Sequence, residues 1–443
     1  MPRRALVFLA IAVGAVPRAE ADGMLDPSFG NGGLVVTPFD EPFPPTDDRG
    51  LSLAVLPDGR AVAAGYTVLN LEQAAMAVAR YMVSGALDTT FGGDGRVIIM
   101  FPPPPGQFDT GARVESVLPQ TDGRLVLVGG AGFQFPPTVF ALARLNPDGS
   151  LDPTFGTDGL VTTSFGSNVS GSGGLLQPDG RIVAAGILGF GFSGPIAAAR
   201  YNADGSLDPT FGTGGKLTLP QFPSFKINDV GLQPDGKILI AGAYGPSAGP
   251  FDFAVVRLLP DGAPDPTFGG DGLVTSDFGS TETGNSLILL ADGRIVLGGD
   301  RGPTSTSDFA LVRYLPDGTV DTTFGNGGLA TADSGAAEIG EQLLRLPNDR
   351  LLLAGFTGDP GPHDFLLARF EPDGALDTSF GTAGFLRTDF PGGNADECQA
   401  VAVAGPDLVL TAGSTFRQPG TADFALARYI ASTPVELLTF SVE

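Results

Sequence analysis

Few residues of this chain have side chains that commonly carry out catalysis. Among its 443 residues there is one histidine, His363, and one cysteine, Cys398. A single histidine excludes zinc sites built from several histidines and excludes repeated Ser-His-Asp triads. His363 lies beside Asp364 in a segment rich in proline and glycine, so we interpret it as a solvated side chain. Cys398 has no partner for an intramolecular disulfide, which predicts a buried or partly buried thiol.

Carboxylates are the abundant functional groups. Asp and Glu number 49 against 25 Lys and Arg, and the net charge of −24 argues against binding nucleic acid or an anionic membrane through a basic face. The aspartates could bind Ca²⁺, but the chain has no Asp-x-Asp-x-Asp-Gly loop, and positions at turns and caps account for most of them. We therefore predict no cofactor and keep Ca²⁺ as an alternative. Paired carboxylates for glycoside cleavage stay open, because their spacing is set in three dimensions.

A repeated motif shows how these residues must be positioned. The pattern Asp-x-Ser/Thr-Phe-Gly-x-x-Gly occurs seven times, and its phenylalanines are Phe29, Phe91, Phe155, Phe211, Phe268, Phe324 and Phe380. The spacing is 56 or 57 residues from Phe155 onward, and the first two spacings, 62 and 64, include insertions. A fixed period of this kind predicts a stacked or ring-closed repeat architecture.

One repeat, residues 151–201, predicts the elements of every unit. Leu151–Gly156 is expected to form a single helical turn that turns Phe155 inward. Four strands are expected at 160–165, 174–177, 181–186 and 196–201, with a tight Pro-Asp-Gly turn between the second and third. Seven such units predict an all-β fold, a seven-bladed β-propeller with four-stranded antiparallel blades. A solenoid is the alternative fold.

Strand polarity predicts the radial order and the closure of the ring. The third strand is apolar throughout, whereas the first is richer in threonine and charge, so the first strand should be outermost. Leu34–Phe39 should then pair with Phe424–Tyr429 and close the ring. The fourth strand of each unit also carries an arginine, for which we predict a buried structural contact with an aspartate or with turn carbonyls. These arginines are Arg80, Arg144, Arg200, Arg257, Arg313, Arg369 and Arg428.

Three motifs together resemble the delta-60 repeat family of bacterial β-propeller-type proteins. They are the Leu-Asp-x-Thr-Phe-Gly block, the Pro-Asp-Gly-Arg-Ile-Val-x-Ala-Gly hairpin and the Phe-Ala-Leu-Ala-Arg-Tyr strand, and the match covers nearly all of residues 25–429. Two units depart from the hairpin, at Pro347–Arg350 and Gly405–Leu408. The resemblance implies an exported, often surface-associated propeller without an assigned molecular role, and it brings no catalytic residues with it.

The two ends of the chain differ from the repeats. Arg3 and Arg4 precede an apolar run at 5–16 and a small-x-small site at 19–21, which predicts a signal peptide over residues 1–21. The run is too short for a transmembrane helix, so we expect no membrane span and an exported protein of the periplasm, cell surface or exterior. The propeller is expected at 22–429, and the tail at 430–443 has the pattern of one more strand.

Insertions between the first and second strands mark three units that a closed ring would bring side by side. Loops often carry the binding residues of a rigid scaffold, although tolerated drift in surface loops is the simpler explanation of such insertions. The candidate binding patch comprises Phe43, Asp47, Asp48, Phe101, Phe108, Asp109, Asp396 and Glu397.

Two functional hypotheses follow from the sequence. The first is a non-catalytic scaffold that binds a protein or polysaccharide of the cell envelope or exterior. The alternative is a carboxylate-based hydrolase or lyase acting on a polysaccharide. An acidic cluster at the central mouth would favour the enzyme, whereas an apolar patch over the insertions would favour the scaffold. The absence of tryptophan weighs against a stacking platform for carbohydrate.

Overall fold

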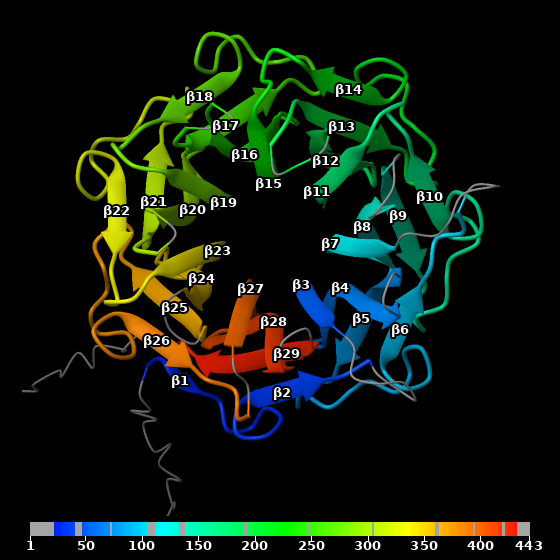
Figure 1. The fold of residues 1–443 in the computed structure, drawn as a ribbon, viewed down its shortest axis with the longest axis horizontal. Coiled ribbons are helices and arrows are strands. Elements are labelled where there is room, and N and C mark those ends of the chain that lie inside the picture. The colour runs from blue at the N-terminus through cyan, green and yellow to red at the C-terminus, as the bar shows by residue number, and fades with distance from the viewer. Residues whose placement is uncertain are drawn as a thin grey trace, which may run out of the picture.

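A computed structural model describes residues 22–39, 47–70, 73–103, 111–132, 138–189, 191, 193–246, 249–303, 305–358, 363–392, 395–418 and 421–431. Seven antiparallel sheets stand as blades around a central axis (Figure 1). Every regular element of the described residues is a strand, which confirms the seven-bladed propeller with four-stranded blades. The predicted signal peptide and residues 432–443 of the tail lie outside the described residues.

Each blade contains four strands in radial order. The innermost strands are β3 (Asp48–Val55), β7 (Ala112–Pro119), β11 (Val169–Leu176), β15 (Phe225–Leu232), β19 (Glu282–Leu289), β23 (Glu338–Arg345) and β27 (Ala395–Gly405). The second strands are β4 (Ala61–Asn70), β8 (Leu125–Ala131), β12 (Ile182–Leu188), β16 (Ile238–Tyr244), β20 (Ile295–Arg301), β24 (Leu351–Thr357) and β28 (Leu408–Gln418). The third strands are β5 (Gln73–Tyr81), β9 (Val139–Leu145), β13 (Ile196–Tyr201), β17 (Asp252–Leu258), β21 (Asp308–Tyr314), β25 (Phe365–Phe370) and β29 (Thr421–Ile430). The outermost strands are β6 (Arg96–Ile99), β10 (Leu160–Thr163), β14 (Lys216–Leu219), β18 (Leu273–Ser276), β22 (Leu329–Ala332), β26 (Phe385–Thr388) and β2 (Leu34–Thr37).

The ring closes between the N-terminal and C-terminal strands, as predicted. Strand β2 pairs antiparallel with β29, with Leu34 opposite Ala427 and Thr37 opposite Phe424. The short strand β1 (Met24–Leu25) also pairs with β29. Figure 1 shows these blue and red segments side by side in one blade. Because the first strand of every repeat is the outer strand of the preceding blade, neighbouring blades are linked through the chain itself.

The hydrophobic core is divided among the blade boundaries. Separate clusters of buried side chains fill the spaces between adjacent blades. The phenylalanine of the repeated motif contributes to these clusters and is fully buried, as for Phe155 and Phe211. Burying one such ring stabilises the fold by about 1.5–3 kcal/mol. The predicted helical turn before Phe155 is instead a hydrogen-bonded turn, closed by the Phe155 amide on the Asp152 carbonyl at 3.1 Å.

The repeated arginine locks each blade to the next. All seven are buried, which confirms the structural role predicted for them. Arg200 donates to Asp208 at 2.7 Å, to the Thr210 hydroxyl at 3.0 Å and to the carbonyl of Pro260 in the following blade. Its guanidinium also lies over the Phe211 ring, 4.9 Å from the centroid. We call the set of an arginine with its aspartate, hydroxyl and phenylalanine an arginine cluster.

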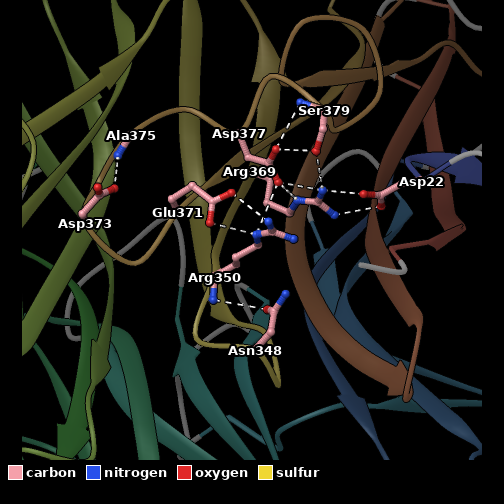
Figure 2. Close-up of polar contacts among 9 residues, drawn as sticks. All are labelled: Asp22, Asn348, Arg350, Arg369, Glu371, Asp373, Ala375, Asp377 and Ser379. Atoms are coloured by element: carbon pink, nitrogen blue, oxygen red, sulfur yellow. Dashed lines mark hydrogen bonds and ion pairs between the residues drawn. The ribbon is translucent and has the colours of Figure 1, made fainter. Parts of the chain in front are cut away.

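The N-terminal segment completes two of these clusters. Arg428 bonds Asp26 at 2.8 Å, although the two residues are at opposite ends of the propeller sequence. Arg369 bonds its own Asp377 and also the carboxylate of Asp22, where other clusters use a turn carbonyl (Figure 2). Closure therefore depends on buried ion pairs as well as on strand pairing.

Candidate functional site

The innermost strands all bend at one position because of a β-bulge. In β15 the register shifts between Ile227 and Asp229, so that Asn228 has no direct partner in β16. The same shift occurs in all seven inner strands; the bulged residue is three residues after the first residue of six of them and four residues after that of β27. A bulge of this kind redirects one side chain and is common beside functional sites.

A glycine in the second strand makes each bulge possible. A Cβ built on Gly242 would lie 1.7 Å from the Lys226 carbonyl oxygen, and one on Gly65 would lie 1.8 Å from that of Arg49. Only glycine allows the bulged strand to come this close. The bulges were not predicted from the sequence, although a signal for them is present there. In every unit a glycine lies six residues after the third residue of the Pro-Asp-Gly turn or its equivalent. These glycines are Gly65, Gly129, Gly186, Gly242, Gly299, Gly355 and Gly413.

The bulges direct seven side chains into the centre of the ring. There they line a central channel that contains a cavity of about 290 Å³. We call these residues the bulge ring. Its members are Leu51, Glu115, Ser172, Asn228, Asn285, Glu341 and Gln399.

The neighbouring position stabilises the ring by linking adjacent inner strands. Ser52 accepts a hydrogen bond from the Val117 amide at 3.0 Å, and Asp229 accepts one from the Leu287 amide at 2.8 Å. Within the bulge ring, Asn228 donates to Asn285 at 2.8 Å. Side chains held by hydrogen bonds to a neighbouring backbone are preorganised for recognition.

Acidic groups in and beside the channel have raised pKa values. Burial, together with the nearby charges of Asp300 and Glu397, raises the pKa of Glu341 to about 8. Burial raises the pKa of Asp300 to about 7, although Lys226 partly offsets this increase. Burial likewise raises the pKa of Asp229 to about 6, although hydrogen bonds from the Leu287 and Val230 amides partly offset this increase. A carboxyl group with a pKa above neutrality is mostly protonated at pH 7 and can donate a hydrogen bond.

Cationic groups are also present near the channel. Arg113 forms an ion pair with Glu115 of the bulge ring. The Lys226 ammonium lies over the Phe251 ring, 3.9 Å from the centroid, and burial lowers its pKa despite the charge of Asp300. Each of these two cations thus offsets the charge of one acidic group, Glu115 or Asp300.

The structure separates the residues of the candidate binding patch. Phe43, Phe108 and Asp109 lie outside the described residues. Phe101 is 5 % exposed and packs in the core between two blades, so its side chain is not available to a partner. Asp48 is fully buried and accepts hydrogen bonds from the Phe39 amide at 2.8 Å and the Thr67 hydroxyl at 2.6 Å.

Two patch residues from distant units meet around one arginine. Arg49 lies 3.2 Å from Asp47 and 3.5 Å from Glu397, and its guanidinium lies over the Phe416 ring. His363 is half-buried 3.4 Å from Glu397 and its ring packs on Phe356, so it is less solvated than the sequence suggested. Ring closure thus brings the last and first units together.

The single cysteine and Asp396 of the candidate binding patch are both buried. Cys398 is buried, as predicted, and its burial raises the pKa of the thiol well above the usual range. Asp396 is 1 % exposed and accepts a hydrogen bond from the Phe390 amide at 2.7 Å. Its burial raises its pKa to about 6. Asp396 also belongs to one of three groups of clustered carboxylates that could hold a metal ion.

Comparison with known proteins agrees with the repeat architecture. Six segments match the family described as "Domain of unknown function (DUF5122) beta-propeller", at residues 56–91, 120–155, 177–211, 233–268, 290–324 and 346–380. The chain is a β-propeller repeat protein. No curated protein shows significant sequence similarity to it. Among the described residues, no helix has the length and apolar character needed to cross a bilayer.

Solved structures with a similar arrangement of strands have very different sequences. A protein of unknown function from Dyadobacter fermentans has a TM-score of 0.47 and 14 % identity, covering 91 % of this chain and 100 % of its own. The polysaccharide lyase Uly1 has a TM-score of 0.48 and 13 % identity, covering 95 % and 94 %. An ulvan lyase of family PL25 has a TM-score of 0.48 and 12 % identity, covering 93 % and 94 %. Similarity at this level gives no information on function.

Proposed function

We propose that this protein is an exported, non-catalytic scaffold that binds a neutral, hydroxyl-rich ligand, such as the end of a polysaccharide chain, in its central channel. The bulge ring is the observation that carries this proposal. Seven blades with closely similar turns and cores place five different types of side chain at one channel position. The fold does not require these side chains to differ, because the bulged backbone depends on the glycine opposite it and not on the side chain that the bulge carries.

The chemistry of the channel supports an uncharged polar ligand. Asn228, Asn285 and Gln399 have amide groups that donate and accept hydrogen bonds, as do the hydroxyls of a sugar. Glu115 is neutralised by Arg113, and the raised pKa of Glu341 keeps it protonated at neutral pH. A charged ligand would therefore find no uncompensated partner of opposite sign among the bulge ring.

Export is the part of the proposal that rests on sequence alone. The charged start, apolar run and small-residue site of residues 1–21 support it. Fractionation of cells that produce the full chain, followed by N-terminal sequencing of the product, tests it directly. We expect a product that begins at Asp22. A full-length product retained in the cytoplasm would contradict export without affecting the channel.

Filling the channel tests ligand binding. Ser172→Tyr places a large side chain at the bulge ring, and Ser150→Tyr makes the same change at an exposed turn. Binding to a panel of neutral oligosaccharides, measured by calorimetry, should be lost in Ser172→Tyr and kept in Ser150→Tyr. Equal binding by both variants would exclude the channel as the site.

A carboxylate-based hydrolase or lyase is the second candidate. The acidic groups near the channel favour it, because both Glu341 and Asp300 have raised pKa values and the charge of Asp300 contributes to that of Glu341. Perturbed pKa values are frequent among catalytic acids and bases. Release of reducing or unsaturated ends from a polysaccharide, abolished by Glu341→Gln while binding remains, would support the enzyme over the scaffold.

A further inference from the structure

Three consecutive blade boundaries carry a group of three carboxylates on the face opposite the Pro-Asp-Gly turns, which we call the loop face. Each group combines an aspartate at the start of the third strand, an aspartate directly after the outer strand, and an acidic residue at the start of the next inner strand. Within each group, ligand oxygens lie within 4.8 Å of one another. The groups are Asp252 with Asp277 and Glu282, Asp308 with Asp333 and Glu338, and Asp364 with Asp389 and Asp396.

The middle group contains a buried carboxylate oxygen without a partner. Glu338 is fully buried, and its Oε1 accepts hydrogen bonds from the amide (3.0 Å) and the hydroxyl of Ser334. Its Oε2 has no hydrogen-bond partner among the described residues. Glu282 of the first group has the same arrangement, being fully buried with an unpaired Oε2. An unpaired buried acceptor is costly and is rare in folded proteins.

Charge compensation distinguishes the three groups. An arginine contacts the first group, with the Arg301 Nε 3.3 Å from Glu282, and Arg387 forms an ion pair with Asp364 of the third. In the middle group no salt bridge joins Asp308, Asp333 or Glu338 to a cation of the described residues, although the charge of Arg301 in the adjacent strand acts on Asp308. Three carboxylates this close repel one another unless protons or a cation balance them.

The repeats provide an internal comparison that separates these groups from ordinary surface acids. At the three equivalent positions the first three blade boundaries have no acid at all. The residues there are Ala75, Met100 and Ala112; Val139, Ser164 and Val169; and Pro195, Pro220 and Phe225. At six of the seven boundaries the three acids are therefore present together or absent together, although they are far apart in sequence; the boundary that closes the ring has two of them, Asp423 and Asp48. Solvated turn aspartates would vary independently.

The boundary that closes the ring shows that an acid at the inner position does not by itself leave an oxygen unpaired. There Pro38 replaces the second aspartate, and Asp48 takes hydrogen bonds from Phe39 and Thr67 instead. Where all three acids are present, one carboxylate oxygen of the inner acid has no hydrogen-bond partner among the described residues.

We propose that Asp308, Asp333 and Glu338 bind a divalent cation, of which Ca²⁺ fits best, and that the two flanking groups are weaker copies of this site. The donors are all oxygens, and three carboxylates with added water can provide the six to eight ligands that Ca²⁺ takes. Asp333 is exposed, so an ion and its waters can enter from solvent. Asp308 and Asp333 belong to one blade and Glu338 to the next, which makes the cation a clamp between blades.

The test uses the full propeller stripped of metal with a chelator and then desalted. Calorimetric titration with Ca²⁺ and thermal unfolding with and without about 1 mM Ca²⁺ measure binding and its effect on stability. We expect binding and a higher Tm in the presence of Ca²⁺, with a smaller effect of Mg²⁺. Asp333→Asn, at an exposed position, should weaken Ca²⁺ binding by at least about tenfold while the protein remains folded.

A matched variant provides the control. Asp94 is an exposed aspartate paired with Arg96 on the opposite face, and Asp94→Asn should leave Ca²⁺ binding unchanged. Glu338→Gln removes the buried charge and should reduce both Ca²⁺ binding and the effect of Ca²⁺ on Tm. Absence of a titration signal in the unaltered protein, or unchanged binding in Asp333→Asn, would overturn the proposal.

Discussion

The two faces of the ring use carboxylates at blade boundaries in opposite ways. On the turn face, which carries the Pro-Asp-Gly turns, Asp208 receives hydrogen bonds from Thr210, Arg181 and Arg200. These bonds outweigh its burial and hold its pKa well below the usual range. On the loop face, burial and the charges of Asp308 and Asp333 outweigh the bonds from Ser334 and raise the pKa of Glu338 to about 7.

This difference explains how often each arrangement occurs. The arginine cluster supplies its own counter-charge and donors, so it can stabilise every boundary in the ring. The acidic groups of the loop face lack enough donors and need a proton or a cation from solvent. Buried charges are tolerated where partners satisfy them and are costly elsewhere. A sevenfold contact is thus architectural, whereas a threefold one with unused oxygens suggests a ligand.

Removal of residues 22–39 should have the largest effect on stability. It deletes β2, the buried rings of Phe29 and Phe39, and the aspartates that complete the clusters of Arg369 and Arg428. Because loss of one buried phenylalanine costs about 3–5 kcal/mol, the free energy of unfolding should fall by at least about 5 kcal/mol. Chemical denaturation measures this loss. An unchanged midpoint would contradict the closure of the ring through β2.

Arg200→Ala should have the next largest effect. It leaves Asp208 buried with fewer donors and removes the contact with Pro260 of the next blade. Breaking a buried ion pair costs about 3–5 kcal/mol. The control is Arg181→Ala, since Arg181 bonds the same aspartate from a more exposed position. Its effect should stay near the 0–1 kcal/mol of surface pairs. A loss below about 0.5 kcal/mol for Arg200→Ala would refute a structural role.

The pH dependence of stability should have opposite signs on the two faces. The lowered pKa of Asp208 gives stability that is present above the unfolded value near 3.8 and is lost in acid. The raised pKa of Glu338 gives stability that is present below about 4.5 and is lost as pH rises through about 7.

Denaturation curves of metal-free protein from pH 4 to pH 8 measure this effect. We expect a loss on the order of 1–3 kcal/mol toward pH 8. Glu338→Gln should reduce this decline, as should saturating Ca²⁺. A decline of the same size in Glu338→Gln and in the unaltered protein would assign it to other groups, such as Glu341 of the channel.

The smallest effect is expected where the candidate patch is exposed. Glu397→Gln weakens a contact of 3.5 Å with Arg49, which retains Asp47 and the Phe416 ring. Surface ion pairs contribute about 0–1 kcal/mol, so the change in unfolding free energy should be below 1 kcal/mol. A change above about 2 kcal/mol would show that this pair is as important as an arginine cluster.

The fold was largely predictable from the repeats, and the inner strands were the main exception. Ile196–Tyr201 forms the strand predicted as the fourth of its repeat, which is the third of its blade because the first strand of each repeat belongs to the preceding blade. The outer strand begins at Leu160 as expected. The inner strand begins at Val169, five residues before the predicted start at Gly174. The missed stretch contains glycines and serines, which have low β-propensity. They form a strand by pairing with β12, and glycine is needed at position 171 because a Cβ there would lie 2.5 Å from the Gly129 carbonyl oxygen of the preceding blade.

The candidate site was less predictable because it depends on contacts between blades. Length differences between units indicated the neighbourhood of Asp47 and Glu397, and the structure brings these residues to Arg49. Loop lengths give no information on whether a side chain points outward, and Phe101 and Asp48 prove to be buried. The bulge ring was detectable only as a recurring glycine in the neighbouring strand.

The sequence by itself determined the number of blades, the radial order of the strands, the closing pair and the buried arginines. The strands and the arginine repeat seven times, so a local pattern in one unit applies to all, and the phase of the repeats then determines which strands close the ring. Only the tertiary structure decided which side chains face the channel and which carboxylates share a boundary. Glu338 and Asp308 meet across two blades, and their ionisation depends on a desolvation that no single repeat contains.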